Sequence, residues 1–318
     1  LGAVAAAINL FVPLPIPLLL VPVALLLLAL QIWGSYRLIA QIFRWLTLAL
    51  FAYILTAFLA HPDGHALLLG TFVPTLRLDG SFIATLVAII GTTISPYLFF
   101  WQSTQEVEEE ISQGKTTVRE RKGATKEELR FASLDVTTGM LISNIVMYTI
   151  ILTTAATLFQ SGKHDVQTAT DLAQALRPLA GNFATILLAV GLVGSGCLAV
   201  PVLAGSAAYA ISEAFGWKYG LEKRPGRAKQ FYTIIVVAML VGAGMNFVGI
   251  NPITALFWSA VINGVLAPPL LVLLMLIGNN PKVMGKRTNR PWLNMLGWLT
   301  TLLMCAAAVA LFFTLGKS

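Results

Sequence analysis

Eight apolar stretches, each long enough to cross a lipid bilayer, constrain this chain more than any other feature. About 20 apolar residues in a helix span the hydrocarbon core, and a helix satisfies its own backbone hydrogen bonds there. The sequence therefore predicts an all-α integral membrane protein, a polytopic helix bundle, and residues 1–11 read as the end of a ninth helix. The stretches are 16–33, 44–60, 82–103, 131–159, 182–215, 230–249, 253–278 and 292–315.

The composition excludes several other classes of protein. Hydrophobic residues make up 57% of the 318 residues and charged residues only 11%, whereas a soluble domain carries about 25% charged residues. A soluble enzyme and a nucleic-acid partner are therefore not expected, and disorder would need a far more polar chain. The continuous apolar runs also differ from the alternating segments of a β-barrel. We expect one transmembrane domain over residues 1–318.

The positive charges alternate along the chain between rich and poor connections. Seventeen of the 21 Lys and Arg residues lie in or beside 34–43, 104–130, 216–229 and 279–291, and the other four are Arg77, Lys163, Arg177 and Lys317. Cytoplasmic loops carry the excess of Lys and Arg. This bias predicts a multi-pass protein of the cell inner (plasma) membrane, with the basic loops in the cytoplasm and the C-terminus outside.

The connection at 104–130 is rich in charges of both signs, with seven Glu among its residues. Mixed charges of this kind are typical of a solvated helical hairpin held by ion pairs. A regulatory metal site in the Glu cluster is the alternative. It is disfavoured because adjacent glutamates do not share one face of a helix.

The stretch 82–103 differs from the other spans because its centre reads Gly91-Thr92-Thr93-Ile94-Ser95-Pro96. Proline lacks an N–H group and displaces the carbonyl four residues earlier, here that of Thr92, and Gly91 supplies backbone freedom. The motif predicts a broken helix with a free Thr92 carbonyl, as in the substrate sites of many transporters. The alternative is a proline kink whose freed backbone is satisfied by neighbouring hydroxyl groups.

The segment GTTISPYLFFWQSTQEVEEE resembles the sixth transmembrane helix, and the loop after it, of the NRAMP family of divalent metal transporters. The resemblance implies a LeuT-like inverted-repeat fold in which this sequence holds the end of helix three and helices four to eleven, so that the first repeat is incomplete. It also implies a secondary transporter of divalent metal cations (Mn, Fe or Mg class) that works by alternating access. The metal would be the substrate, no cofactor would be bound permanently, and protons are the candidate coupling ion.

The resemblance assigns metal-ligand roles to two residues at the break. The family's ligating carbonyl falls on Thr92, its Met thioether falls on Ser95, and its motif proline is Pro96. A thioether suits soft transition metals, whereas hydroxyl and carbonyl oxygens suit Mg, Ca or Mn. Ser95 should therefore weaken selection against hard ions. The closest resemblance is to NRAMP-related branches of altered selectivity, including magnesium-transporting ones.

Five further residues are accessory candidates. Thr93 adds a hydroxyl group at the break, and Tyr97 and Gln102 stand where the family has two histidines. A tyrosine has a reference pKa near 10 and does not do the work of a histidine at neutral pH, which places proton coupling through Tyr97 in doubt. Asn144 and Asn263 fall where the family has polar residues in later helices.

The other half of the family's site comes from an Asp-Pro-Gly-Asn motif in the first helix, and this sequence contains no such motif. It therefore holds half a site, and we expect the first helices to lie outside it. Two alternatives stay open: a transporter of another small solute such as an amino acid, and a truncated non-transporting membrane protein. An intramembrane enzyme is disfavoured because HExxH and GxSxG motifs are absent. Gly194-Ser195-Gly196-Cys197 predicts close helix packing instead.

Overall fold

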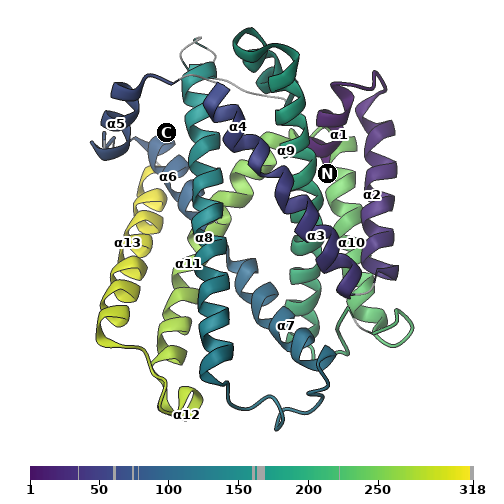
Figure 1. The fold of residues 1–318 in the computed structure, drawn as a ribbon, viewed down its shortest axis with the longest axis vertical. Helices are drawn as coiled ribbons and strands as arrows, with labels where there is room; N and C mark the ends of the chain where they lie inside the picture. The colour runs from purple at the N-terminus through teal and green to yellow at the C-terminus, as the bar shows by residue number, and fades with distance from the viewer. Residues whose placement is uncertain are drawn as a thin grey trace. The chain divides into compact units, whose positions relative to one another are not determined.

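The computed structural model describes residues 1–34, 36–59, 62–73, 75–77, 79–159, 162, 169–221 and 223–315, and the side chains of 36, 37, 40, 158, 169–184 and 315 are outside that description. Every regular element in these residues is a helix, which confirms the all-α prediction (Figure 1). The elements are α1 (Gly2–Asn9), α2 (Ile16–Trp33), α3 (Tyr36–Ala49), α4 (Phe51–Leu59), α5 (Gly64–Phe72), α6 (Gly80–Thr93), α7 (Pro96–Ser112), α8 (Lys126–Thr154), the π-helix η1 (Ala155–Phe159), α9 (Ala169–Ala214), α10 (Lys229–Phe247), α11 (Pro252–Gly278), α12 (Pro281–Met284) and α13 (Pro291–Leu315).

Eight segments of the described residues are long and apolar enough to cross a membrane, and each corresponds to one of the eight stretches expected from the sequence. The longest helix, α9, has 46 residues and so measures about 69 Å at 1.5 Å per residue. This is more than twice the roughly 30 Å of the hydrocarbon core. The apolar part of this helix, Thr185–Ala214, alone has 30 residues.

The chain divides into two compact units, each described here by itself. Unit 1 comprises residues 1–73 and 100–253, and unit 2 comprises residues 74–99 and 254–318. The division falls within α7, between Phe99 and Phe100, four residues after the interruption at Ile94 and Ser95.

In unit 1, α9 is the helix on which α1, α4 and α10 pack. Small residues make this close approach geometrically feasible: a Cβ on Gly194 would overlap the Cβ of Ala49, and one on Gly196 would overlap Val4. Between these glycines, the Ser195 hydroxyl lies 3.3 Å from that of Tyr53. The prediction of close helix packing at this small-residue segment is confirmed.

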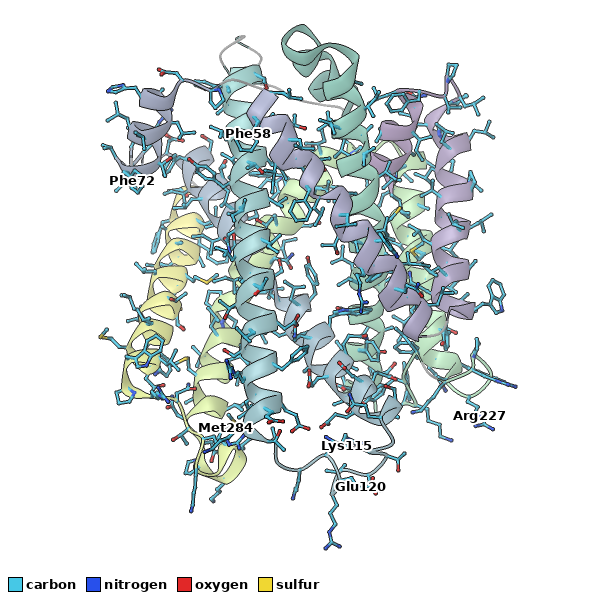
Figure 2. All side chains as sticks on the ribbon, viewed as in Figure 1. Phe58, Phe72, Lys115, Glu120, Arg227 and Met284 are labelled. Carbon is cyan, nitrogen blue, oxygen red and sulfur yellow. The ribbon has the colours of Figure 1, made fainter. Side chains whose placement is uncertain are left out.

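The two ends of unit 1 differ in the residues they present. Figure 2 shows Lys115, Glu120 and Arg227 at one end, and Phe58 and Phe72 at the other. The first three come from the connections 104–130 and 216–229, two of the basic set. These connections therefore share one end of the unit, as strict alternation of rich and poor connections requires.

In unit 2, α6 packs against α11 and α13. Its buried face carries Ile83 and Val87, which lie in one apolar cluster with Val261 of α11 and Leu311 of α13. Lipid tails are as apolar as these side chains, so van der Waals packing rather than the release of water holds such helices together in a membrane. This packing fixes α6, the helix that leads into the interruption.

Candidate functional site

The span between 80 and 112 is interrupted at Ile94 and Ser95. Helix α6 ends at Thr93, Ile94 leaves helical geometry with φ −115° and ψ 71°, and α7 starts at Pro96. Proline is well suited to the first position of a helix, where its missing N–H would have no intrahelical partner. The sequence motif thus ends one helix and begins the next.

The Ser95 side chain occupies the interruption. Its hydroxyl group donates to the carbonyl oxygens of Gly91, at 2.9 Å, and Thr92, at 3.0 Å, and the residue is only 2% exposed. In an unbroken helix the Thr92 carbonyl would accept the N–H of residue 96, which Pro96 lacks. The expectation of a free Thr92 carbonyl was wrong, because the Ser95 hydroxyl takes the place of the missing N–H.

Gly91 has a different role from the one expected of it. It lies within α6 in helical conformation, so backbone freedom is not its contribution. A Cβ at Gly91 would overlap the Ala260 carbonyl and the backbone of Gly264, and a Cβ at Gly264 would overlap the Val87 carbonyl. The two glycines allow the backbones of α6 and α11 to touch one turn before the interruption.

The threonine hydroxyls beside the interruption are engaged with the backbone. Thr92 and Thr93 each donate from their side chain to the Ile89 carbonyl at 2.8 Å. Thr92 is exposed and Thr93 is half-buried, as is Tyr97 in the first turn of α7. Threonine hydroxyls commonly bond to carbonyls three or four residues earlier in this way.

The remaining accessory candidates are divided between the units. Asn263 is half-buried on α11 and precedes Gly264, the residue that meets α6. Gln102 and Asn144 are exposed residues of unit 1, and the Asn144 amide donates to the Met140 carbonyl at 2.8 Å. The structure therefore brings Thr92, Ser95 and the Asn263 segment of α11 into one unit, and it assigns Gln102 and Asn144 to the other.

The donors at the interruption are neutral oxygens. Among the residues that the structure describes, no three His, Cys, Asp or Glu side chains lie close enough to hold a metal ion together. Within α6 and the first turn of α7, the ligand atoms on offer are backbone carbonyl and hydroxyl oxygens. Such oxygens suit hard cations such as Mg or Mn and not soft ones.

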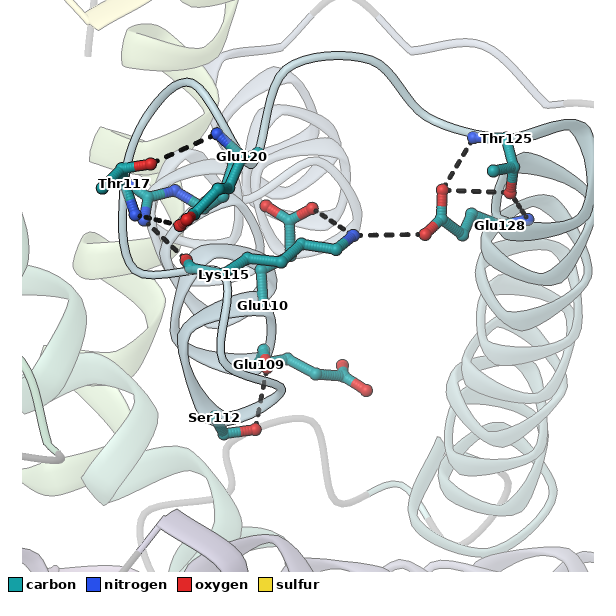
Figure 3. A network of polar contacts seen from close by, with 9 residues as sticks. Glu109, Glu110, Ser112, Lys115, Thr117, Glu120, Thr125 and Glu128 are labelled. Carbon is teal, nitrogen blue, oxygen red and sulfur yellow. Dashed lines mark hydrogen bonds and ion pairs between the residues drawn. The ribbon is translucent and has the colours of Figure 1, made fainter.

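The charged connection after α7 is organised by ion pairs (Figure 3). The Lys115 ammonium lies 3.3 Å from Glu110 of α7 and 3.2 Å from Glu128 of α8, and hydrogen bonds to these two carboxylates raise the Lys115 pKa. Glu128 also forms a reciprocal capping box with Thr125 at the start of α8. A hairpin with mixed ion pairs, rather than a glutamate metal site, accounts for this segment.

One glutamate of this segment is not solvated. Glu108 is only 5% exposed and accepts a hydrogen bond from Tyr209 of α9 at 3.4 Å. The mixed charges of 104–130 predicted a solvated hairpin, and the burial of Glu108 is an exception to that prediction. The available signal was helical spacing, since Trp101, Thr104 and Glu108 lie on one face of α7.

Comparisons with known proteins agree with the resemblance seen in the sequence. A family model described as "Natural resistance-associated macrophage protein-like" matches residues 1–314. The chain is 26% identical to the divalent metal cation transporter MntH of Bacillus subtilis over 313 residues, which cover 97% of this chain and 69% of that protein. It is 27% identical over 263 residues to the protein of that name in Vibrio campbellii, and these residues cover 83% of this chain and 57% of that protein. It is 25% identical over 258 residues to the protein of that name in Listeria innocua, and these residues cover 80% of this chain and 55% of that protein.

The chain thus spans 55% to 69% of the length of these three relatives. The family model, in contrast, matches nearly all of its residues. The match runs through the interrupted span, the charged connection and all eight apolar segments. On this evidence the chain belongs to the Nramp family.

Proposed function

We propose that this protein is a secondary transporter that carries divalent metal cations across a membrane by alternating access, with the metal as its substrate. Membership of the Nramp family and the names of its relatives support this function. An interruption inside an apolar span supports it independently, because broken helices provide backbone carbonyls for ions in many transporters.

The observation that carries the proposal is the spacing of two oxygens at the interruption. The Thr92 carbonyl oxygen and the Ser95 hydroxyl oxygen lie 3.0 Å apart. Two neighbouring ligands about 2.1 Å from an octahedral cation such as Mg²⁺ are separated by about 3.0 Å. When the cation binds, the hydroxyl hydrogen of Ser95 would rotate away from the Thr92 carbonyl. The two oxygens would then form one edge of the cation's coordination shell.

The chemistry of these ligands favours a hard cation. Both are neutral oxygens, and Ser95 stands where the resemblance places a thioether. Oxygen ligands favour Mg or Mn over soft metals. A cation of this kind takes six or more ligands, and Thr92 and Ser95 would supply two of them. Thr93, Tyr97 and Asn263 are the accessory candidates in the same unit.

The charge pattern gives the proposed orientation. The connections rich in Lys and Arg would face the cytoplasm and the C-terminus would lie outside, in the plasma membrane. Residues 80–112 would then run from outside to inside. Protons are the proposed coupling ion, which predicts that metal uptake acidifies the receiving compartment.

Transport in proteoliposomes tests the function and the ligand together. We expect uptake of Mn²⁺ or Mg²⁺, and we expect Ser95→Met to shift preference toward a softer ion such as Cd²⁺ by several-fold. Ser103→Met is the matched control, since Ser103 is an exposed serine of α7 outside the interruption. No uptake across a broad metal panel, with stabilisation by amino acids instead, would replace the proposal with a transporter of another solute. Unchanged selectivity in Ser95→Met would remove Ser95 from the ligand set.

A further inference from the structure

The C-terminal half of α7 carries a buried carboxylate that the proposed metal site does not use. Glu108 accepts a hydrogen bond from the Tyr209 hydroxyl of α9 at 3.4 Å. Gly220, in the connection between α9 and α10, has φ +127°, and a Cβ placed there would come within 2.5 Å of the Glu108 carboxylate. The carboxylate is thus enclosed by a helix on one side and by a glycine of the connection on the other.

The Tyr209 hydroxyl links this carboxylate to the connection itself. Besides donating to Glu108, it accepts the Leu221 N–H at 3.3 Å. The Tyr232 hydroxyl of α10 donates to the Lys223 carbonyl at 2.9 Å and to that of Leu221 at 3.4 Å. We call Glu108, Tyr209, Gly220 and Leu221 the Glu108 latch. It joins α7, the end of α9 and the segment that leads into α10.

Aromatic rings keep water away from the latch. Tyr209 is fully buried, and its ring lies 4.8 Å from Phe231, 5.8 Å from Tyr219 and 6.1 Å from Trp101 between centroids. Trp101 of α7 packs on Gly205 of α9, where a Cβ would overlap the indole. Electrostatic and hydrogen-bond interactions of a carboxylate are stronger in such a poorly solvated site than in water, so the loss of this carboxylate should matter more than the loss of an exposed one.

The position of Glu108 along the chain indicates that the latch holds α7. The interruption at Ile94 and Ser95 separates α7 from the hydrogen-bond ladder of α6. Helix α6 packs within unit 2, whereas α7 from Phe100 onward belongs to unit 1. A helix segment released at its N-terminal end keeps its orientation through contacts further along, and Glu108 makes such a contact three turns after Pro96.

We propose that Glu108 is a positioning residue which fixes α7 against α9 and the 215–228 connection, and that opening of this latch accompanies movement of α7 during transport. The second part rests on the proposed function. The first part does not, because it concerns only contacts within unit 1.

Hydrogen–deuterium exchange on the whole protein, combined with uptake assays, tests the proposal. Glu108→Gln removes the charge and keeps the size, and Tyr209→Phe removes only the hydroxyl. We expect each variant to exchange several-fold faster over residues 100–112 and 215–221, and the double variant to exchange no faster than the more affected single one. Glu109→Gln is the matched control: the same change on the adjacent, exposed glutamate should leave exchange unaltered.

The uptake assay separates gating from structural support. We expect Glu108→Gln to change the maximal uptake rate several-fold while the KM for Mn²⁺ or Mg²⁺ changes less than twofold, because Glu108 is not one of the proposed ligands. Equal exchange in Glu108→Gln and Glu109→Gln would overturn the latch. Faster exchange with unchanged uptake would overturn its part in transport. Faster exchange in a protein that moves none of the metals would support the latch while refuting the transport function.

Discussion

Ser95 donates its hydroxyl to the carbonyl of Thr92 at 3.0 Å, the carbonyl whose regular helical partner is replaced by a proline. The serine therefore supplies from its side chain the hydrogen bond that Pro96 cannot supply from its backbone. The relationship has two consequences: the Thr92 carbonyl keeps a hydrogen-bond donor although Pro96 has no N–H, and two oxygens are held at the spacing that the proposed cation site needs.

Removal of that hydroxyl should destabilise the protein. Ser95→Ala leaves the carbonyls of Gly91 and Thr92 without this donor in a buried site, which costs about 1–3 kcal/mol. Thermal unfolding in detergent would measure the loss. Ser103→Ala is the control, because the Ser103 hydroxyl also bonds to a carbonyl, that of Phe100, but from an exposed position. An equal loss in both variants would contradict the special role of Ser95.

Replacing Gly91 or Gly264, where α6 and α11 cross, by a residue with a side chain should lower the stability of the protein. Gly91→Ala and Gly264→Ala each place a methyl group against the backbone of the facing helix, and such overpacking costs about 1–3 kcal/mol. Gly139→Ala in α8 meets no atom within 4 Å and should instead stabilise by about 0.5–1 kcal/mol, since alanine favours a helix over glycine. Unfolding midpoints of the three variants measure the contrast, and a loss at Gly139 equal to that at Gly91 would refute it.

The start of α6 should weaken in acid. The Ser81 hydroxyl donates to Asp79 at 2.6 Å and the Phe82 N–H donates at 2.9 Å; together with nearby Arg77 they lower the Asp79 pKa. A lowered folded-state pKa means that the ionised cap stabilises the fold above the unfolded value of about 3.9. That contribution is lost as pH falls through the folded-state pKa.

The measurement for Asp79 is a difference between proteins across pH. At neutral pH, Asp79→Ala should unfold at a lower temperature than the wild type, because an N-cap is lost. As pH falls below the unfolded-state value of about 3.9 and through the lowered folded-state pKa, the difference between the two unfolding temperatures should shrink as Asp79 of the wild type becomes protonated. A constant difference across this range would show that the charge of Asp79 has no part in capping α6.

Lys115 should hold the hairpin between α7 and α8. Its ammonium lies within 3.3 Å of both Glu110 and Glu128, so Lys115→Met should speed hydrogen exchange over 113–125. High salt should reproduce part of this effect in the wild type, because exposed ion pairs are screened. Lys122→Met, at an exposed lysine outside the bonds drawn in Figure 3, is the control. Exchange that is insensitive to both the substitution and the salt would exclude a structural role for this pair.

The sequence alone determined the membrane class, the number of spans and the position of the interruption. These features follow from local chemistry: each span must be apolar over its own length, and Pro96 lacks its N–H in any surroundings. Alternation of Lys and Arg likewise placed the connections 104–130 and 216–229 at one end of unit 1. The family resemblance was also carried by one continuous segment.

Only the tertiary structure decided what the residues near the interruption contact. Gly91 faces Gly264, more than 170 residues away, so packing rather than flexibility explains it. The Ser95 side chain could face lipid or the backbone, and in the structure its hydroxyl bonds to the carbonyls of Gly91 and Thr92. Glu108 differs from Glu109 only in the face of α7 on which it lies, and burial followed because Tyr209 and Gly220 occupy that face. Contacts between distant segments depend on how the helices pack, and no local stretch of residues determines that packing.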